Sequence, residues 1–322
     1  KLMEETTETI ILSGRKISKE IKKECKERLK EIQSTFITKG PPGLAVVLVG
    51  NRPDSAVYVR MKKKAAKLIG IKNIDIALPE DVSLQELLKQ IDSLNENEQV
   101  HGILVQLPLP SHLKEDVVLS RIRLEKDVDG FHSQNMGLLA MKGREPLAQP
   151  CTPSGCIELL KRYNIPIAGK KAVVLGRSNI VGIPIALMLI KENATVTICH
   201  SRTVDLKKEV LEADILIAAI GKPKFVQKDW IKKGAVIIDV GINEIKNEEG
   251  QTELVGDTDF DAICSDGNVK AITPVPGGVG PMTIAMLMQN TLRAFERNNK
   301  RIGGDTPLHD ASSLSNNEKT IE

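Results

Sequence analysis

The sequence predicts an α/β fold built as two domains around a cleft, and three observations lead to that prediction. Short apolar runs rich in β-branched residues recur along the chain, namely "GLAVVLVG", "GILVQLPLP", "KAVVLG", "ATVTICHS", "DILIAAIG" and "AVIIDVG". Amphipathic stretches such as "SLQELLKQIDSLN" and "GIPIALMLIKEN" lie between them. A segment rich in Pro and Gly, "GREPLAQPCTPSG", divides this alternation near the middle of the chain. Apolar strands that alternate with helices are typical of parallel sheets covered on both faces.

The dividing segment sets the expected domain boundaries. Residues 1–155 are predicted to form an α/β substrate domain, and residues 156–280 a Rossmann-type parallel-sheet nucleotide domain. The helical stretch 281–300 is expected to pack back on the first domain and complete it. Thr152 and Pro153 suit the N-cap and the first turn of the helix that follows the boundary. The polar, Ser- and Asn-rich tail 303–322 is expected to be disordered.

Composition narrows the class of protein. The chain has 322 residues, of which 41% are hydrophobic and 27% charged, as in ordinary globular proteins. A net charge of +3 is too small to indicate nucleic-acid binding, and aromatic residues make up only 2%. Five cysteines without paired metal-ligand spacing favour a reduced, intracellular protein without a metal site. No apolar run reaches the roughly 18 residues of a membrane span.

The segment 170–203 is a candidate dinucleotide-binding unit. Its sequence "KKAVVLGRSNIVGIPIALMLIKENATVTICHSRT" predicts a strand, a glycine turn, a helix and a second strand. Such a unit can hold a pyrophosphate at the helix N-terminus. Gly176 and Gly182 stand at the outer positions of the glycine pattern, but Ser178 occupies the middle one. The pattern alone leaves a dinucleotide site and a plain tight turn as equal alternatives.

The end of the second strand favours NADP over NAD. NAD sites usually carry an acid there, which accepts from the ribose 2′-hydroxyl. Here the strand ends in Ser201 and Arg202, and Arg177 lies in the first turn. A hydroxyl and two guanidinium groups suit a 2′-phosphate. The alternative is that the two arginines are simply exposed cations.

The stretch "SAVYVRMKKKAAKLIGI" (55–71) predicts a helix whose five cations do not share one face. At about 100° per residue, four of them fall on one solvated arc: Arg60, Lys63, Lys64 and Lys67. The apolar residues occupy the opposite arc, together with Tyr58 and Lys62, which are neighbours one turn apart. A lysine on an apolar face is costly unless paired or neutral, and burial lowers a lysine pKa toward the range of proton transfer. A lysine whose stem packs while its ammonium reaches water is the alternative.

Two further residues are expected near Lys62. Gln106 interrupts the apolar run "GILVQLPLP", and Asp129 lies in a turn beside Gly130. Ligands of open α/β sheets bind beyond the carboxyl ends of the strands, where both side chains could converge. An amide can accept a hydrogen bond from the lysine, and a carboxylate can take two from the N–H edge of a heterocycle. Asp129 could equally be an ordinary turn former.

With these residues placed, the sequence resembles the bifunctional methylenetetrahydrofolate dehydrogenase/methenyltetrahydrofolate cyclohydrolase family. Seven segments carry the resemblance, in family order over about residues 10 to 300: "VGNRPDSAVYVRMKKKAAKLIGI", "GILVQLPLP", "EKDVDGFHSQNMG", "PCTPSGCIELL", "GRSNIVGIP", "CHSRT" and "ITPVPGGVGPMT". The resemblance implies a homodimer, with a folate domain and an NADP-binding Rossmann domain.

The resemblance also implies roles for particular residues. Lys62, Tyr58, Gln106 and Asp129 would be catalytic, the last three also holding the folate together with Pro276, Gly277 and Gly278. The cofactor would contact Gly176, Arg177, Ser178, Ser201, Arg202, Gly280 and Thr283. NADP+ would oxidise 5,10-methylenetetrahydrofolate to the 5,10-methenyl cation, and water would then convert this to 10-formyltetrahydrofolate, with Lys62 managing protons. Neither a nucleic acid nor a membrane is an expected partner.

Two other functions fit the residues. One is an NADP-dependent dehydrogenase of a small hydroxy acid, in which Tyr58 and Lys62 relay a proton. The other is a non-catalytic folate- or nucleotide-binding protein. The expected compartment is the cytoplasm, or the mitochondrial matrix or another organelle if a targeting segment has been removed.

Overall fold

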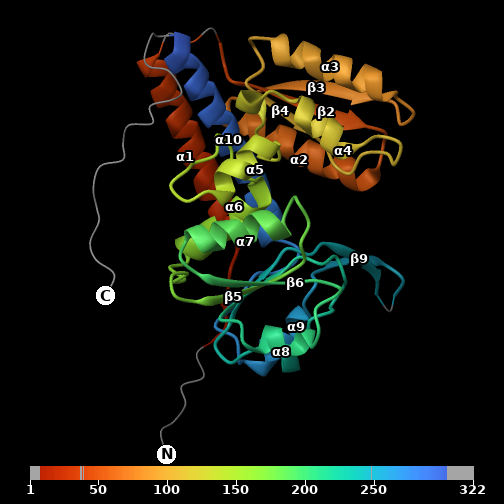
Figure 1. Ribbon diagram of the computed structural model, residues 1–322, viewed down its shortest axis with the longest axis vertical. Helices are drawn as coiled ribbons and strands as arrows, with labels where there is room; N and C mark the ends of the chain where they lie inside the picture. Colours follow the sequence, from red (N-terminus) through yellow and green to blue (C-terminus); the bar gives the residue numbers. More distant parts are fainter. Residues whose placement is uncertain (1–7, 37, 39, 248, 303–322) are drawn as a thin grey trace, which may run out of the picture.

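The computed structural model describes residues 8–302 except 37, 39 and 248. Two parallel sheets lie at opposite ends of the molecule, and a group of long helices lies between and beside them (Figure 1). The predicted disordered tail lies outside the described residues. No helix in the described part of the chain combines the length and apolarity needed to cross a membrane.

The smaller sheet has three parallel strands in the order β3-β2-β4. They are β2 (Gly43–Val49), β3 (Lys72–Leu78) and β4 (Gly102–Val105). Its connecting helices are α2 (Pro53–Ile69), α3 (Leu84–Glu96), α4 (Glu115–Arg121) and η1 (Leu124–Lys126). A proline in the first turn starts α2, left-handed Gly70 ends it, and a Ser83–Glu86 capping box starts α3. Buried aliphatic residues of α3 pack on one face of the sheet.

The larger sheet has six parallel strands in the order β1-β11-β8-β7-β5-β6. They are β1 (Ile10–Ile11), β5 (Lys171–Leu175), β6 (Thr195–Cys199), β7 (Ile215–Ala218), β8 (Val236–Asp239) and β11 (Ala271–Ile272). Its connections contain α7 (Gly182–Lys191), α8 (Leu206–Leu211), η2 (Lys228–Trp230), α9 (Phe260–Asp266) and an antiparallel hairpin of β9 (Asn243–Lys246) and β10 (Thr252–Val255). Each of the six predicted apolar runs contains a strand. Two of these strands, β2 and β4, belong to the smaller sheet, and four belong to this one: β5, β6, β7 and β8.

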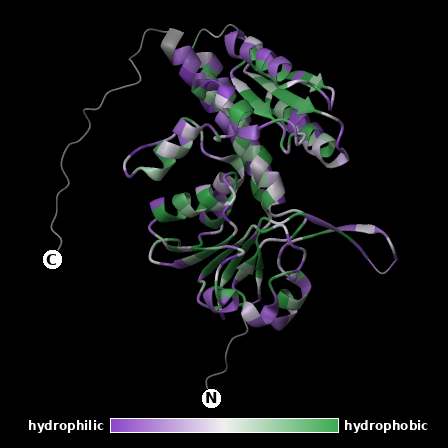
Figure 2. Cartoon of the chain, turned by 45° about the vertical axis from the view of Figure 1, so that its right-hand side comes forward, coloured by the Kyte–Doolittle hydropathy of each residue, from purple (hydrophilic) through white to green (hydrophobic). Residues whose placement is uncertain are grey.

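Three helices fill the middle of the molecule. α10 (Val279–Ile302) packs against α1 (Gly14–Thr35) and α6 (Cys151–Arg162), and α5 (Ser133–Ala140) lies against α7 (Figure 1). The three share one core of aliphatic and methionine side chains with Phe295. The strands are mostly hydrophobic, whereas the helices alternate hydrophobic and hydrophilic residues (Figure 2).

Four features differ from the sequence prediction. The short strand β1 belongs to the larger sheet, although it was placed with residues 1–155. The half-exposed strand β3 and the hairpin β9–β10 were not predicted, because neither forms a continuous apolar run. Thr152 does not cap α6: that helix begins at Cys151 with Pro150 as N-cap. The Thr152 hydroxyl instead lies 3.0 Å from that of Thr283 on α10.

Candidate active site

The predicted pair of Lys62 and Gln106 is brought together at the carboxyl edge of the smaller sheet. Lys62, on α2, is only 9% exposed, and its Nζ donates to Gln106 Oε1 at 2.9 Å. Gln106 directly follows β4, and its Nε2 donates to the main-chain oxygen of Leu107 at 2.7 Å. This second bond fixes the amide so that its oxygen faces the lysine.

The exposure of the other α2 side chains agrees only in part with the two arcs that the sequence predicted. Arg60, Lys64 and Lys67 are exposed, but Lys63 is half-buried and forms a 2.9 Å ion pair with Asp75. Three residues of the expected apolar arc are exposed as well: Val57, Met61 and Leu68. The buried face of α2 is therefore narrower than predicted, and Lys62 lies within it.

Asp129 lies near Lys62 in a half-buried position. Burial raises the pKa of its carboxyl to about 6, and the nearby Lys62 charge and a hydrogen bond from Cys151 oppose that rise. Cys151 itself is 2% exposed, and burial raises its thiol pKa well above the ordinary value. The thiol is thus a protonated neighbour of the carboxylate, close to the pair of Lys62 and Gln106.

Tyr58 reaches toward the first turn of α10. Its side chain is half-buried, and a methyl group added at Gly280 would lie 3.9 Å from Tyr58 Oη. The loop that precedes α10 contacts the start of α1. Arg15 N donates to Gly277 O at 3.0 Å, and a methyl group on Gly14 would lie 1.7 Å from Gly278 O. The close backbone approach at Pro276–Gly278 is therefore made to the start of α1.

The glycine turn after β5 is as tight as its sequence suggested. Gly176 has φ +109°, and a Cβ there would lie 2.2 Å from Ala219 O. A Cβ at Gly182 would lie 2.3 Å from Gly176 O. Ser178 Oγ accepts from the main-chain N–H groups of Val181 and Gly182 at 3.2 and 3.3 Å. The residue at the middle position of the pattern thus closes the turn onto the start of α7.

The residues expected at a 2′-phosphate come from neighbouring strand ends. Strands β5 and β6 are paired in parallel, with Leu175 opposite Cys199. Arg177 and Ser178 follow the first strand, Ser201 and Arg202 follow the second, and all four are exposed. Arg202 N donates to His200 Nδ1 at 3.1 Å, which shapes the short turn between them.

Two buried aspartates that the sequence did not indicate organise the carboxyl edge of the larger sheet, beside the glycine turn. The carboxylate of Asp257 accepts from the main-chain N–H groups of Ile220, Gly221 and Lys222, at 2.7 to 3.0 Å. Asp239, at the end of β8, accepts from Asp257 N and from Thr258. Burial raises the pKa of Asp239 to about 6. An acid directly after a buried strand is the signal that could have indicated this arrangement.

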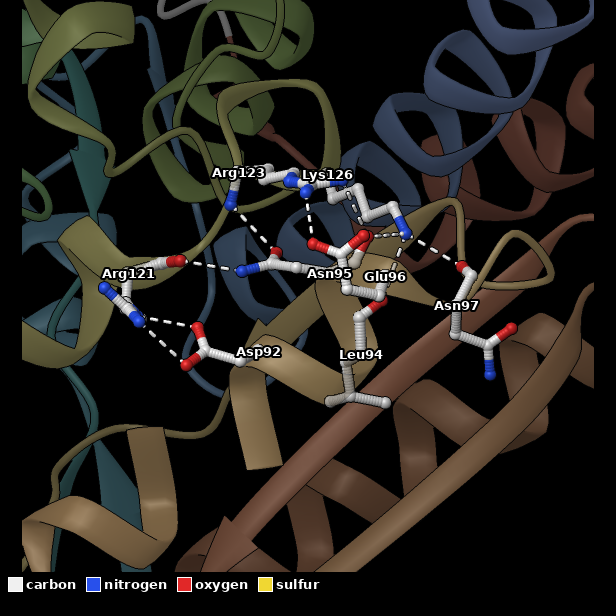
Figure 3. A network of polar contacts seen from close by, with 8 residues as sticks. All are labelled: Asp92, Leu94, Asn95, Glu96, Asn97, Arg121, Arg123 and Lys126. Atoms are coloured by element: carbon white, nitrogen blue, oxygen red, sulfur yellow. Dashed lines mark hydrogen bonds and ion pairs between the residues drawn. The ribbon is translucent and has the colours of Figure 1, made fainter. Parts of the chain in front are cut away.

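A second partly buried lysine lies at the amino edge of the smaller sheet. Lys126 Nζ donates to the main-chain oxygens of Leu94, Asn95 and Asn97 at 2.7 to 3.0 Å, at the C-terminus of α3 (Figure 3). Burial, with the nearby Arg123 charge, lowers its pKa to about 8. Asn95 adds bonds to the neighbouring loop, and Arg123 pairs with Glu96.

A cavity of about 840 Å³ opens beside this lysine. Its lining includes His101, which precedes β4 and packs edge-on against Phe295, with ring centroids 4.8 Å apart. Burial lowers the pKa of His101 to about 4, so its ring is neutral. The cavity lies at the opposite edge of the sheet from Lys62 and Gln106. Among the described residues, no group of His, Cys, Asp and Glu is placed to hold a metal ion.

Comparisons with known proteins cover nearly the whole chain. Residues 12–129 match the catalytic domain of tetrahydrofolate dehydrogenase/cyclohydrolase, and residues 150–299 match the NAD(P)-binding domain of the same family. The bifunctional protein FolD 4, chloroplastic, of Arabidopsis thaliana is 54% identical over 296 residues, which cover 89% of this chain and 79% of that protein. The bifunctional protein FolD of Agathobacter rectalis is 52% identical over 288 residues, covering 89% and 99%.

Solved structures agree with these matches. The FolD methylenetetrahydrofolate dehydrogenase/cyclohydrolase of Campylobacter jejuni is 44% identical, with a TM-score of 0.83 and coverage of 90% of this chain and 99% of that one. The FolD enzyme of Trypanosoma brucei, solved with an NADP cofactor and an inhibitor, is 42% identical. Its TM-score is 0.85, and the match covers 90% of this chain and 98% of that one.

Proposed function

The chain belongs to the tetrahydrofolate dehydrogenase/cyclohydrolase family, and from this premise we propose how its residues divide the work of the two reactions. It is a bifunctional enzyme of folate-dependent one-carbon metabolism. It oxidises 5,10-methylenetetrahydrofolate with NADP+ to the 5,10-methenyl form, and hydrolyses that form to 10-formyltetrahydrofolate. The observation that carries the proposal is the bond from buried Lys62 to Gln106, with Asp129 nearby.

Oxidation requires that the two ligands be held in the right relative position. The bridging methylene loses a hydride, and the bound cofactor would supply the acceptor for it. Tyr58 stacks on the folate, and Asp129 accepts from its pterin ring. Correct placement of the reacting atoms accounts for much of such a rate, because the step needs no acid or base from the protein.

The nucleotide side of the chain suits NADP. A Cβ at Gly176 or Gly182 would collide with neighbouring main chain, so the two glycines allow the tight turn that would present the N-terminus of α7 to a diphosphate. Arg177, Ser201 and Arg202 would hold the 2′-phosphate, because they stand at adjacent strand ends without a competing acid there. Gly280 and Thr283, near the start of α10, are also assigned to the cofactor; Gly280 faces Tyr58 and Ile242, and the Thr283 hydroxyl lies against that of Thr152.

Hydrolysis requires proton transfer, and we assign it to Lys62. Water attacks the methenyl carbon and becomes the formyl oxygen, so it gives up both of its protons. One of them ends on the folate nitrogen N5 when the ring opens, and the other leaves to solvent. The amine of Lys62 accepts and passes on protons in this sequence, while Gln106 fixes its position.

The activity test compares both reactions and both cofactors in one preparation. Oxidation of methylenetetrahydrofolate and hydrolysis of methenyltetrahydrofolate are measured side by side, first with NADP+ and then with NAD+. We expect turnover in both assays and a lower KM for NADP+. A panel of small hydroxy acids is the negative control. Turnover of a hydroxy acid, or folate binding without turnover, would contradict the assignment.

The remaining organisation is also proposed. Residues 12–155 with α10 form the folate domain, and residues 156–280 with the strand β1 form the nucleotide domain; the family models divide the chain between 129 and 150. The enzyme acts as a homodimer, which sedimentation at several concentrations tests. It works in the cytoplasm or in an organelle, and the chloroplastic Arabidopsis relative supports the second location. Localising a tagged chain tests that choice.

A further inference from the structure

A buried amide on α10 joins the two segments that flank Asp129. Asn290 is 3% exposed, and its Nδ2 donates to Val128 O at 2.9 Å and to Gln149 O at 2.8 Å. Val128 directly precedes Asp129, and Gln149 lies just before α6. One side chain thus connects α10 to two segments that are 162 and 141 positions away.

The turn that carries Asp129 is also held from its other side. The carboxylate of Asp127 accepts from Gly130 N, His132 N and Asn135 Nδ2 at 2.8 to 3.0 Å. Gly130 has φ +75°, and a Cβ there would lie 2.5 Å from the carbonyl carbon of Gln149. The Asp129 turn therefore lies directly on the segment that Asn290 holds, and a small shift of that segment moves the turn.

Cys151 supports the same carbonyl. Its Sγ donates to Val128 O at 3.3 Å and lies 3.6 Å from Asn290 Nδ2, close to the Asp129 carboxyl. Val128, Cys151 and Asn290 are all almost fully buried. Val128 O lies in the interior, so loss of the amide leaves that main-chain oxygen with reduced hydrogen bonding, and it also releases the half-buried Gln149 O from α10.

Asn299 on the same helix shows what a purely local amide does. It is 6% exposed, and its Nδ2 donates to Phe295 O at 2.8 Å, four residues earlier in α10. Removing that bond affects one helix turn. Removing the Asn290 bonds frees two segments from α10, one of which carries a residue assigned to the substrate.

We propose that Asn290 is a positioning residue for folate recognition. It fixes the main chain on both sides of Asp129, so that the carboxylate is presented to the pterin ring. The inference rests on the proposed role of Asp129 in folate binding. It predicts that loss of the Asn290 amide weakens the binding of folate but not that of NADP+. The hydrogen bonds of this amide go to Val128 and Gln149 and do not involve the nucleotide turn at Gly176.

The test compares Asn290→Leu with Asn299→Leu in the dehydrogenase assay. The first variant should raise the KM for methylenetetrahydrofolate by about tenfold and leave the KM for NADP+ unchanged. The control should leave both KM values unchanged, even if its melting temperature falls. A purely structural role for Asn290 predicts a lower melting temperature with both KM values as in the wild type, and that result would overturn the proposal.

Asp129→Asn, run alongside, separates this inference from the proposed function. If Asp129→Asn weakens folate binding but Asn290→Leu does not, the positioning role fails and the substrate role stands. If Asp129→Asn binds folate normally, the substrate role itself fails. Should the leucine variant not fold, Asn290→Ala is measured with saturating NADP+, which stabilises the folded chain. Its KM for folate must also rise, and an unchanged value overturns the proposal.

Discussion

The two lysines at opposite edges of the smaller sheet use burial differently. Lys126, at the amino edge, donates to three main-chain oxygens at the end of α3. Such an arrangement satisfies the ammonium and also complements the helix dipole. Lys62, at the carboxyl edge, is the more buried of the two but donates to a side-chain amide.

The comparison indicates that burial of a charge does not by itself mark a catalytic site. The partners decide: fixed carbonyls hold a lysine in a structural role, whereas an amide at a strand end leaves it directed toward ligands. A cavity of about 840 Å³ lies beside Lys126, whereas Lys62 lies near the carboxyl of Asp129, and we propose Lys62 as the catalytic lysine.

The largest effect is expected for Lys62→Met. Cyclohydrolase activity on supplied methenyltetrahydrofolate should fall by about a hundredfold or more, because the proton-transfer group is gone. Folding and the KM for NADP+ should stay as in the wild type. Lys67→Met, an exposed position on the same helix, is the matched control. Hydrolysis at the wild-type rate would remove Lys62 from the mechanism.

Lys126→Met should show the opposite pattern. Three carbonyls lose a charged donor, so the free energy of unfolding should fall by about 2 kcal/mol, a factor of about thirty in the folding equilibrium. Urea unfolding measures this loss, with the exposed Lys89→Met as control. Both activities should remain at wild-type level in the folded protein. A selective loss of one activity would contradict a structural role.

Arg202→Ala tests the proposed role of Arg202 in binding NADP. The KM for NADP+ should rise by about tenfold while the KM for NAD+ stays the same, because the proposed partner of the 2′-phosphate is lost. Arg60→Ala, which removes an exposed arginine from α2, should change neither value. Equal effects on the two cofactors would place Arg202 away from that phosphate.

The smallest effect is a pH dependence of folate binding. The pKa of Asp129 is raised to about 6, so its carboxylate is mostly ionised at pH 7 and is lost as the pH falls through that value. The Kd of tetrahydrofolate should therefore rise by about fourfold between pH 7 and pH 5.5. Calorimetric titration measures it. Asp129→Asn should bind more weakly and lack this dependence; an unchanged dependence would assign it to another group.

The sequence predicted six of the strands and the pairing of Lys62 with Gln106, because periodicity and strand ends are local signals, but it missed the seven-residue strand β3. It did not predict the hydrogen bond from Asn290 to Val128, which joins residues 162 positions apart, or the cap that Lys126 forms on α3. The Thr152 cap was wrong because α6 starts two residues earlier, with Pro150 as N-cap, and the Thr152 hydroxyl faces Thr283. Contacts of this kind depend on how distant elements pack, and no spacing in the chain reports them.

Product analysis of the Lys62→Met variant shows whether Lys62 is needed for hydrolysis of the methenyl compound. Wild-type enzyme, Lys62→Met and Lys126→Met are each given methylenetetrahydrofolate and NADP+. The folates are identified by mass before uncatalysed hydrolysis becomes appreciable. We predict that the wild type and Lys126→Met form 10-formyltetrahydrofolate, whereas Lys62→Met stops at the methenyl compound. Formation of 10-formyltetrahydrofolate by Lys62→Met at the wild-type rate would contradict the account.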